Sequence, residues 1–252
     1  EVIIMPRASR VKSESGIYHI MLRGINQQVI FEQSEDYEKF TEILNKYKAI
    51  SGYKVFAYCL MSNHIHLVIK EEKESIEQII KRIAGSYVYW YNWKYYRKGH
   101  LFQDRFRSEP IEDEKYLLTV IRYIHRNPVK AKISEKSADY PYSSYKEYIT
   151  DESGIVDKDF VYEHISKEGF IEFNNENTED KCLDIEDYVF RISDDDARRV
   201  IQNIAGITST TELQLFDRDE RNKCIKKMKQ KGLSIRQISR LTGISFAIVR
   251  NI

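Results

Sequence analysis

The sequence predicts an α+β protein in which a ferredoxin-like domain with an antiparallel sheet precedes a small all-helical domain. Strand-like and helix-like patterns follow one another in the order β-α-β-β-α-β-α up to residue 150, and only helical patterns follow residue 190. At 252 residues the chain is long enough for two domains. We therefore expect domains at 5–150 and 191–252, joined by an acidic connector at 151–190.

The first half of the predicted ferredoxin-like unit follows from side-chain periodicity. Residues 16–24 alternate apolar and polar side chains, which predicts a strand that ends at Gly24. Residues 35–50 carry apolar side chains every three or four positions, as an amphipathic helix does. Residues 53–61 and 64–70 are strand-like runs separated by two polar residues, which is hairpin spacing.

The second half repeats this order and adds a helix. Residues 75–96 predict a long helix that ends in an aromatic stretch, and residues 101–111 predict a fourth strand. Residues 114–127 predict a further helix with acidic residues at its start. We expect the helices of the ferredoxin-like unit to cover one side of the sheet.

Composition excludes several classes of protein. No apolar run approaches the roughly 20 residues of a membrane span, and no secretory pattern opens the chain, so we expect a cytoplasmic protein. Cys59, Cys182 and Cys224 lie too far apart for a disulfide framework or a CxxC zinc site. Residues 1–4 precede Met5 and are expected to be a leader outside the fold.

Charge is distributed unevenly along the chain despite a net charge of +1. Residues 151–220 hold 20 acidic and 7 basic side chains, whereas residues 221–252 hold 9 basic and no acidic ones. Residues 81–110 form a second basic stretch, with 7 basic and 2 acidic side chains. Either stretch could be a solvated surface, but together they favour a polyanionic partner such as nucleic acid.

Two histidines form the first candidate site. His64 and His66 are two apart on a predicted strand, so both side chains leave the same face, about 7 Å apart along the strand. An imidazole pair completed by an oxygen ligand suits Mg²⁺ or Mn²⁺. The pattern alone also allows two ordinary core or surface histidines.

A tyrosine and an amide on the last predicted helix of the first domain complete the candidate site. Tyr123 and Asn127 are four apart and share a helix face, where the phenol can act as a nucleophile and the amide oxygen as a metal ligand. Spacing alone also allows a core tyrosine and a helix-ending asparagine before Pro128. His125 points away from Tyr123 by about 200° on a helix, so we expect it outside the site.

These motifs together resemble a known family. The His64-Ile65-His66 triplet and the run from Tyr123 to Lys130 are similar to those of the single-tyrosine HUH transposases, in particular the REP-associated tyrosine transposases. The resemblance covers about residues 5–150 and includes the segments MPRASRVKSESGIYHIMLRGIN, MSNHIHLVI, GHLFQDRFRS and YPYSSY.

The resemblance implies a mechanism. His64, His66 and Asn127 would hold a divalent metal, and Tyr123 would attack a phosphate of single-stranded DNA near a hairpin. A 5′-phosphotyrosine would form and a 3′-hydroxyl would be released, and a second 3′-hydroxyl would reverse the attack without a nucleotide cofactor. The family includes monomers and helix-swapped dimers, so a homodimer is also compatible.

Basic and aromatic side chains supply candidate DNA contacts. Trp90 and Trp93 could stack on unpaired bases or belong to the core. The tyrosines of the helix at 75–96 are expected to serve in packing or base stacking rather than as nucleophiles; they are Tyr87, Tyr89, Tyr91, Tyr95 and Tyr96. The expected phosphate contacts are Lys94, Arg97, Lys98, Arg105, Arg107 and Lys130.

The C-terminal residues predict a helix-turn-helix. Apolar residues have helical spacing on both sides of Gly243, which suits the tight turn between two helices. Arg236, Arg240 and Arg250 are expected to contact duplex DNA. The alternative is a helical bundle that makes only protein contacts.

Two other functions remain open at this point. One is a non-catalytic, domesticated protein that binds nucleic acid or regulates transcription, because ferredoxin-like sheets and helix-turn-helix units also bind without cleaving. The other is a hydrolytic metallonuclease that uses activated water and does not need Tyr123.

Overall fold

The computed structural model contains one four-stranded antiparallel sheet in the order β2-β3-β1-β4, as the ferredoxin-like prediction requires. The strands are β1 (Ile17–Arg23), β2 (Lys54–Met61), β3 (His64–Lys70) and β4 (Arg107–Ile111). The structure describes residues 10–150, 154–176, 178, 180, 182–183 and 194–252.

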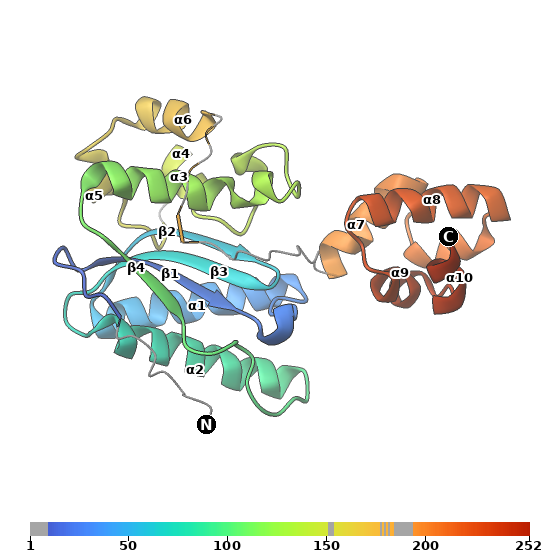
Figure 1. The fold of residues 1–252 in the computed structure, drawn as a ribbon, viewed down its shortest axis with the longest axis horizontal. Helices are drawn as coiled ribbons and strands as arrows, with labels where there is room; N and C mark the ends of the chain where they lie inside the picture. Colours follow the sequence, from blue (N-terminus) through green and yellow to red (C-terminus); the bar gives the residue numbers. More distant parts are fainter. Residues whose placement is uncertain (1–9, 151–153, 177, 179, 181, 184–193) are drawn as a thin grey trace, which may run out of the picture.

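Helices cover both faces of this sheet (Figure 1). The two helices within the ferredoxin-like unit, α1 (Ser34–Ser51) and α2 (Ile76–Lys94), pack on one face, as predicted. The helix that follows β4, α3 (Glu114–Lys130), lies on the opposite face, where α4 (Tyr145–Ile149) joins it. The sheet is therefore buried on both sides.

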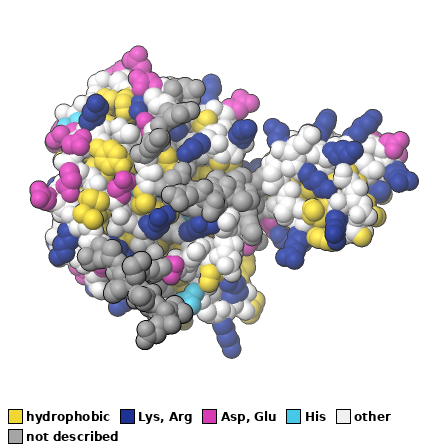
Figure 2. All heavy atoms as spheres, viewed as in Figure 1, with side chains coloured by type: hydrophobic (Ala, Val, Ile, Leu, Met, Phe, Trp, Pro, Cys, Tyr) yellow, Lys and Arg dark blue, Asp and Glu magenta, His cyan; other side chains and the backbone are white. Residues whose placement is uncertain are grey.

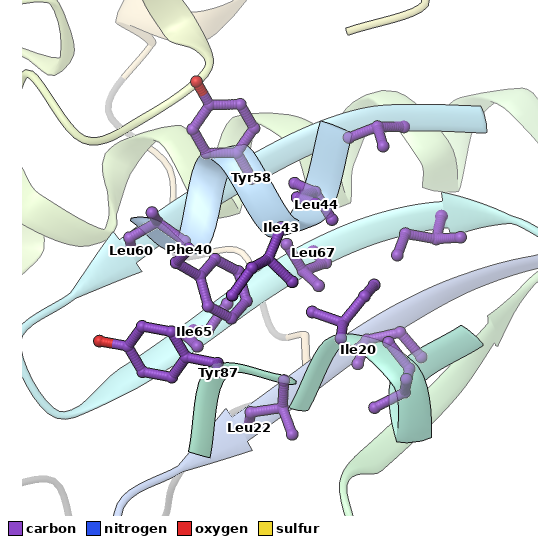
Figure 3. Close-up of a cluster of buried hydrophobic side chains, with 14 of the residues drawn as sticks. Ile20, Leu22, Phe40, Ile43, Leu44, Tyr58, Leu60, Ile65, Leu67 and Tyr87 are labelled. Atoms are coloured by element: carbon purple, nitrogen blue, oxygen red, sulfur yellow. The ribbon is translucent and has the colours of Figure 1, made fainter. Parts of the chain in front are cut away.

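Alternation along the strands divides the apolar side chains between two cores. Ile20 and Leu67 point toward α1 and α2 and pack around Phe40, as Figure 3 shows. Ile17 and Val68 point the other way and pack against α3. Residues at odd positions of β1 and at even positions of β3 therefore share the α3 face of the sheet.

Two predicted elements differ from those observed. The strand expected at 101–111 begins only at Arg107, because Asp104 adopts a left-handed conformation (φ 55°) that interrupts the extended chain. The helix expected at 114–127 continues to Lys130, because Pro128 lacks only its own N–H group and Ala131 N still donates to Asn127 O at 2.9 Å.

The segment expected as an acidic connector is partly folded. It contains α5 (Lys158–Tyr162) and α6 (Lys167–Asn175), whose buried Val161 and Phe170 pack into the core on the α3 face. Apolar residues at helical spacing within a strongly acidic sequence explain why composition alone suggested a connector. The domain boundaries remain predictions, and the expected leader at residues 1–4 lies outside the described residues.

The C-terminal part is helical, as predicted, and has its own core. Its helices are α7 (Asp194–Ala205), α8 (Arg218–Gln230), α9 (Ile235–Thr242) and α10 (Phe246–Asn251), which meet around the buried Ile225 and Ile238. Gly243 lies between α9 and α10 with a φ of 72°, the left-handed turn that the sequence predicts there.

Three short 3₁₀ helices complete the fold: Ile25–Gln27, Ser137–Asp139 and Thr210–Leu215. A search of the described helices found none with the length and apolar character needed to cross a membrane.

Candidate functional site

The predicted histidine pair lies on the α3 face of the sheet. His64 and His66 leave β3 on the same side, and their ring centroids are 5.0 Å apart. Strand β1 runs beside them, with Arg23 opposite His64 and Met21 opposite His66. Directly opposed residues share a face, so β1 and β3 together line one site.

Helix α3 brings Tyr123 to this pair. The Tyr123 ring centroid lies 5.9 Å from that of His66, with the two rings nearly perpendicular. Asn127 lies one turn further along α3, and its Nδ2 donates to the Tyr123 carbonyl oxygen at 3.2 Å, which leaves the amide oxygen as an acceptor. The core alternative for Tyr123 is partly right, because its ring is buried, but it is buried against the histidines.

The ring nitrogens of the pair suit metal binding. His64 Nδ1 lies 2.9 Å from Asn63 Oδ1, an acceptor, so Nδ1 donates and Nε2 carries a lone pair. His66 Nε2 is buried without a hydrogen-bond partner. Burial, with His64 nearby, holds the pKa of His66 well below its ordinary value, so the imidazole is neutral.

The candidate donor set therefore consists of two imidazoles, of which that of His66 is neutral, and the amide of Asn127 one turn beyond Tyr123 on α3. Within the described part of the chain, no group of three or more His, Cys, Asp or Glu side chains is arranged to hold a metal ion. An orphaned, buried imidazole nitrogen beside a second imidazole fits a divalent cation that accepts nitrogen ligands, such as Mn²⁺.

Sequence reasoning missed two residues near the pair. His19 Nε2 lies 2.9 Å from His66 Nδ1, and Glu109 Oε2 lies 3.7 Å from His19 Nδ1. The neighbouring His19 is the main cause that lowers the pKa of Glu109. The alternation of residues 16–24 places His19 on the same face as Arg23, but only the strand order places it beside His66.

His125 lies outside this site, as expected. It is fully buried on the other side of α3, with Nε2 2.8 Å from Ser144 Oγ and Nδ1 3.3 Å from Asn174 Oδ1. Burial lowers its pKa to about 3, so it is a neutral hydrogen-bonding residue of the core.

The tyrosines of α2 lie on the far side of the sheet from the histidines. The hydroxyl groups of Tyr87 and Tyr91 donate to the backbone oxygens of Ile30 and Val29, and that of Tyr95 donates to Asp36. These three are packing residues, whereas Tyr89 and Tyr96 are exposed. Trp93 is also exposed, and Trp90 packs against the core.

Three of the predicted phosphate contacts lie near the site. Arg105 and Arg107 line a pocket of about 450 Å³ together with Arg23, the residue opposite His64. The Lys130 Nζ lies 5.2 Å from the centre of the Tyr123 ring. These cations can hold the phosphates of a strand that passes Tyr123.

The other predicted contacts of the first domain lie at the C-terminal end of α2. Lys94 is ion-paired with Asp36 at 2.7 Å and Glu35 at 3.0 Å, and Arg97 donates to Gln28 Oε1 at 3.0 Å, so both hold structure together. Lys98 is exposed. The structure does not bring this group to Tyr123.

The three predicted arginines of the C-terminal part are exposed, and Figure 2 shows Lys and Arg side chains spread over its visible face. Arg240 also pairs with the carboxylate of Asp194, at 2.8 Å for Nη2. Arg236 and Arg250 flank it on α9 and α10.

Comparisons with known proteins agree with the family resemblance of the sequence motifs. Residues 12–127 match a family model described as IS200-like transposase. A REP-associated tyrosine transposase of Haemophilus influenzae is 28% identical, over 46% of this chain and 76% of that protein.

Two solved structures are also similar. A REP-associated tyrosine transposase bound to a REP hairpin has a TM-score of 0.51 at 18% identity, over 57% of this chain and 86% of that one, and shows the same fold. A transposase of Deinococcus radiodurans has a TM-score of 0.34 at 16% identity, over 48% of this chain and 97% of that one. On the family match, the curated relative and the shared fold, this chain is similar to the IS200-like transposases, and in particular to the REP-associated tyrosine transposases.

Proposed function

We propose that this protein is a transposase that cleaves and rejoins single-stranded DNA through Tyr123. The observation that supports this role is the position of Tyr123, whose ring packs edge-on against His66 on the face that carries both histidines. Tyr87, Tyr91 and Tyr95 face the opposite core and are bonded to backbone or to Asp36, whereas Tyr89 and Tyr96 are exposed.

In the proposed reaction the Tyr123 oxygen bonds to a phosphorus atom, and the bond from that phosphorus to the 3′-oxygen breaks. The product is a 5′-phosphotyrosine and a free 3′-hydroxyl, so the tyrosine loses one proton and the leaving oxygen gains one. A 3′-hydroxyl of another strand reverses the step. Lys130, Arg105 and Arg107 hold the phosphates of the strand around Tyr123 by charge.

His64, His66 and Asn127 would hold a divalent ion, Mg²⁺ or Mn²⁺, which when bound polarises the scissile phosphate. The buried, unpartnered Nε2 of His66 supports this set. Asn63 fixes the ring of His64 through its Nδ1.

Hairpin DNA is the proposed substrate, since the solved relative of the same fold is bound to a REP hairpin. Duplex DNA is the proposed partner of α9 and α10, where Arg236 and Arg250 are exposed on a surface rich in cations (Figure 2).

The test is incubation of the full chain with end-labelled hairpin oligonucleotides and Mn²⁺, followed by denaturing electrophoresis. We expect a protein-DNA adduct that Tyr123→Phe abolishes. The matched control is Tyr89→Phe, which removes the hydroxyl of an exposed tyrosine on α2.

Two other outcomes would indicate a hydrolytic metallonuclease or a non-catalytic binding protein. Cleavage without an adduct, retained by Tyr123→Phe, would show activated water as the nucleophile. Binding without cleavage in all variants would show a non-catalytic nucleic-acid-binding protein.

A further inference from the structure

We infer that His19 and Glu109 position His66 as a metal ligand by fixing which of its ring nitrogens carries the proton. This inference deepens the proposed function, because it rests on His66 binding the metal through Nε2. The His19 ring also lies edge-on to that of the proposed nucleophile Tyr123, with centroids 6.1 Å apart, and the role that we assign to His19 and Glu109 is exerted through His66.

The side chains of His66, His19 and Glu109 form a line across the adjacent strands β3, β1 and β4. Strand β1 lies between β3 and β4, and His19 lies directly opposite Glu109 in the ladder of β1 and β4. On its other side His19 reaches His66, with a distance of 2.9 Å between His19 Nε2 and His66 Nδ1. All three side chains point toward α3.

The close nitrogen pair allows only two neutral arrangements, because one proton lies between two imidazole nitrogens at this distance. If His66 Nδ1 carries the proton, His66 Nε2 has a lone pair and can bind a metal. If His19 Nε2 carries it, His66 is protonated at Nε2 and cannot bind.

Glu109 selects the first arrangement. The carboxylate of Glu109 lies 3.7 Å from His19 Nδ1 and favours a proton on that nitrogen by charge, and in a neutral His19 protonated there Nε2 has a lone pair that accepts from His66 Nδ1–H. The result is a neutral His66 whose buried Nε2 is ready to coordinate.

Glu109 is itself held in place. Leu183 N donates to its Oε2 at 3.1 Å, and Tyr116 hydrogen-bonds to the same carboxylate. Tyr116 belongs to α3, two turns before Tyr123, so the line of side chains connects the metal ligand to the helix of the nucleophile.

The first experiment measures Mn²⁺ binding to the full chain by titration calorimetry. We expect His19→Leu, which removes the acceptor, to weaken binding about tenfold to a hundredfold. His19→Gln places an amide oxygen within reach of His66 Nδ1 and should restore most of the affinity. Glu109→Gln should weaken binding about tenfold.

The matched control is Glu112→Gln. Glu112 is a carboxylate just after β4 that accepts from Ser15 N at 3.0 Å and touches no histidine in the hydrogen bonds described. Unchanged Mn²⁺ affinity is expected for this variant. Wild-type affinity in both His19→Leu and Glu109→Gln would overturn the inference.

The second experiment needs no metal and separates the two proposals. Nitrogen-15 shifts report the tautomer of each of the six histidines, and we expect His66 protonated at Nδ1 in the wild type and shifted toward Nε2–H in His19→Leu. An Nε2–H tautomer in the wild type would overturn the inference. Absence of Mn²⁺ binding by the wild type, with the Nδ1–H tautomer present, would instead overturn the proposed metal dependence.

Discussion

The ammonium group of Lys130 lies over the ring of Tyr123, two turns further along α3, at 5.2 Å from the ring centre. Pro128 lies between them without ending the helix, so the two side chains share one face. A helix that stopped at Asn127 would leave Lys130 in a loop. The continued helix therefore places a positive charge beside the proposed nucleophile.

Lys130→Ala should slow adduct formation about tenfold to a hundredfold, because the cation stabilises negative charge that develops at the phosphate. Lys130→Arg should stay within a few-fold of the wild type. Single-turnover cleavage of a labelled hairpin measures both. Lys115→Ala, an exposed lysine near the start of the same helix, is the control, and an equal loss in both alanine variants would contradict this role.

Asp36→Asn should destabilise the first domain by about 3 kcal/mol, because the buried carboxylate holds Lys94 at 2.7 Å and accepts from two backbone N–H groups before α1. Urea unfolding of the full chain, followed by Trp fluorescence, measures the change. Glu35→Gln is the matched control, since Glu35 pairs with the same lysine but is 71% exposed. It should cost less than about 1 kcal/mol, and equal costs would refute the assignment.

Gly243→Ala should destabilise the turn between α9 and α10 more than Gly206→Ala destabilises the turn after α7. Both glycines have positive φ (72° and 66°), which costs alanine about 1 kcal/mol or more. Only at Gly243 would the new Cβ lie 2.3 Å from Gln214 Nε2, which donates to Thr242 O. The displaced hydrogen bond adds about 1 kcal/mol.

Hydrogen exchange in α9 and α10 measures this difference. In a Gln214→Ala background the extra cost of Gly243→Ala should disappear. If it persists there, the cost does not arise from Gln214.

Glu32→Gln should make stability less dependent on pH. Burial, with Asp194 nearby, raises the pKa of Glu32 to about 7 from its ordinary 4.5. A folded-state pKa above the unfolded one means that the native state loses stability as pH rises from about 4.5 to 7, by about 3 kcal/mol in total.

The Glu32→Gln variant lacks this loss, so it should match the wild type near pH 4 and exceed its stability by about 3 kcal/mol at pH 8. Unfolding curves at both values measure this. Glu38→Gln, an exposed change on α1, should behave as the wild type at both. A gain for Glu32→Gln that is equal at both pH values would show that the pKa of Glu32 is not involved.

The sequence by itself determined the features that depend on neighbours along the chain. The period of two on β3 places His64 and His66 on one face, and the period of 3.6 on α3 places Tyr123 above Asn127. The element order of the ferredoxin-like unit follows from the same periodicities. The predicted start of β4 and the predicted end of α3 were less accurate. The local pattern reveals neither the left-handed conformation of Asp104 nor the continuation of α3 through Pro128.

Only the tertiary structure decided which elements meet. The strand order puts β1 between β3 and β4, and this brings His19 to both His66 and Glu109 although 47 residues separate the two histidines. The same packing pairs Lys94 with Asp36, an ion pair that the basic stretch at 81–110 does not reveal. Periodicity predicts on which face of a helix or strand a side chain lies. The residues that it contacts on that face depend on how distant segments pack, and no local sequence pattern contains that information.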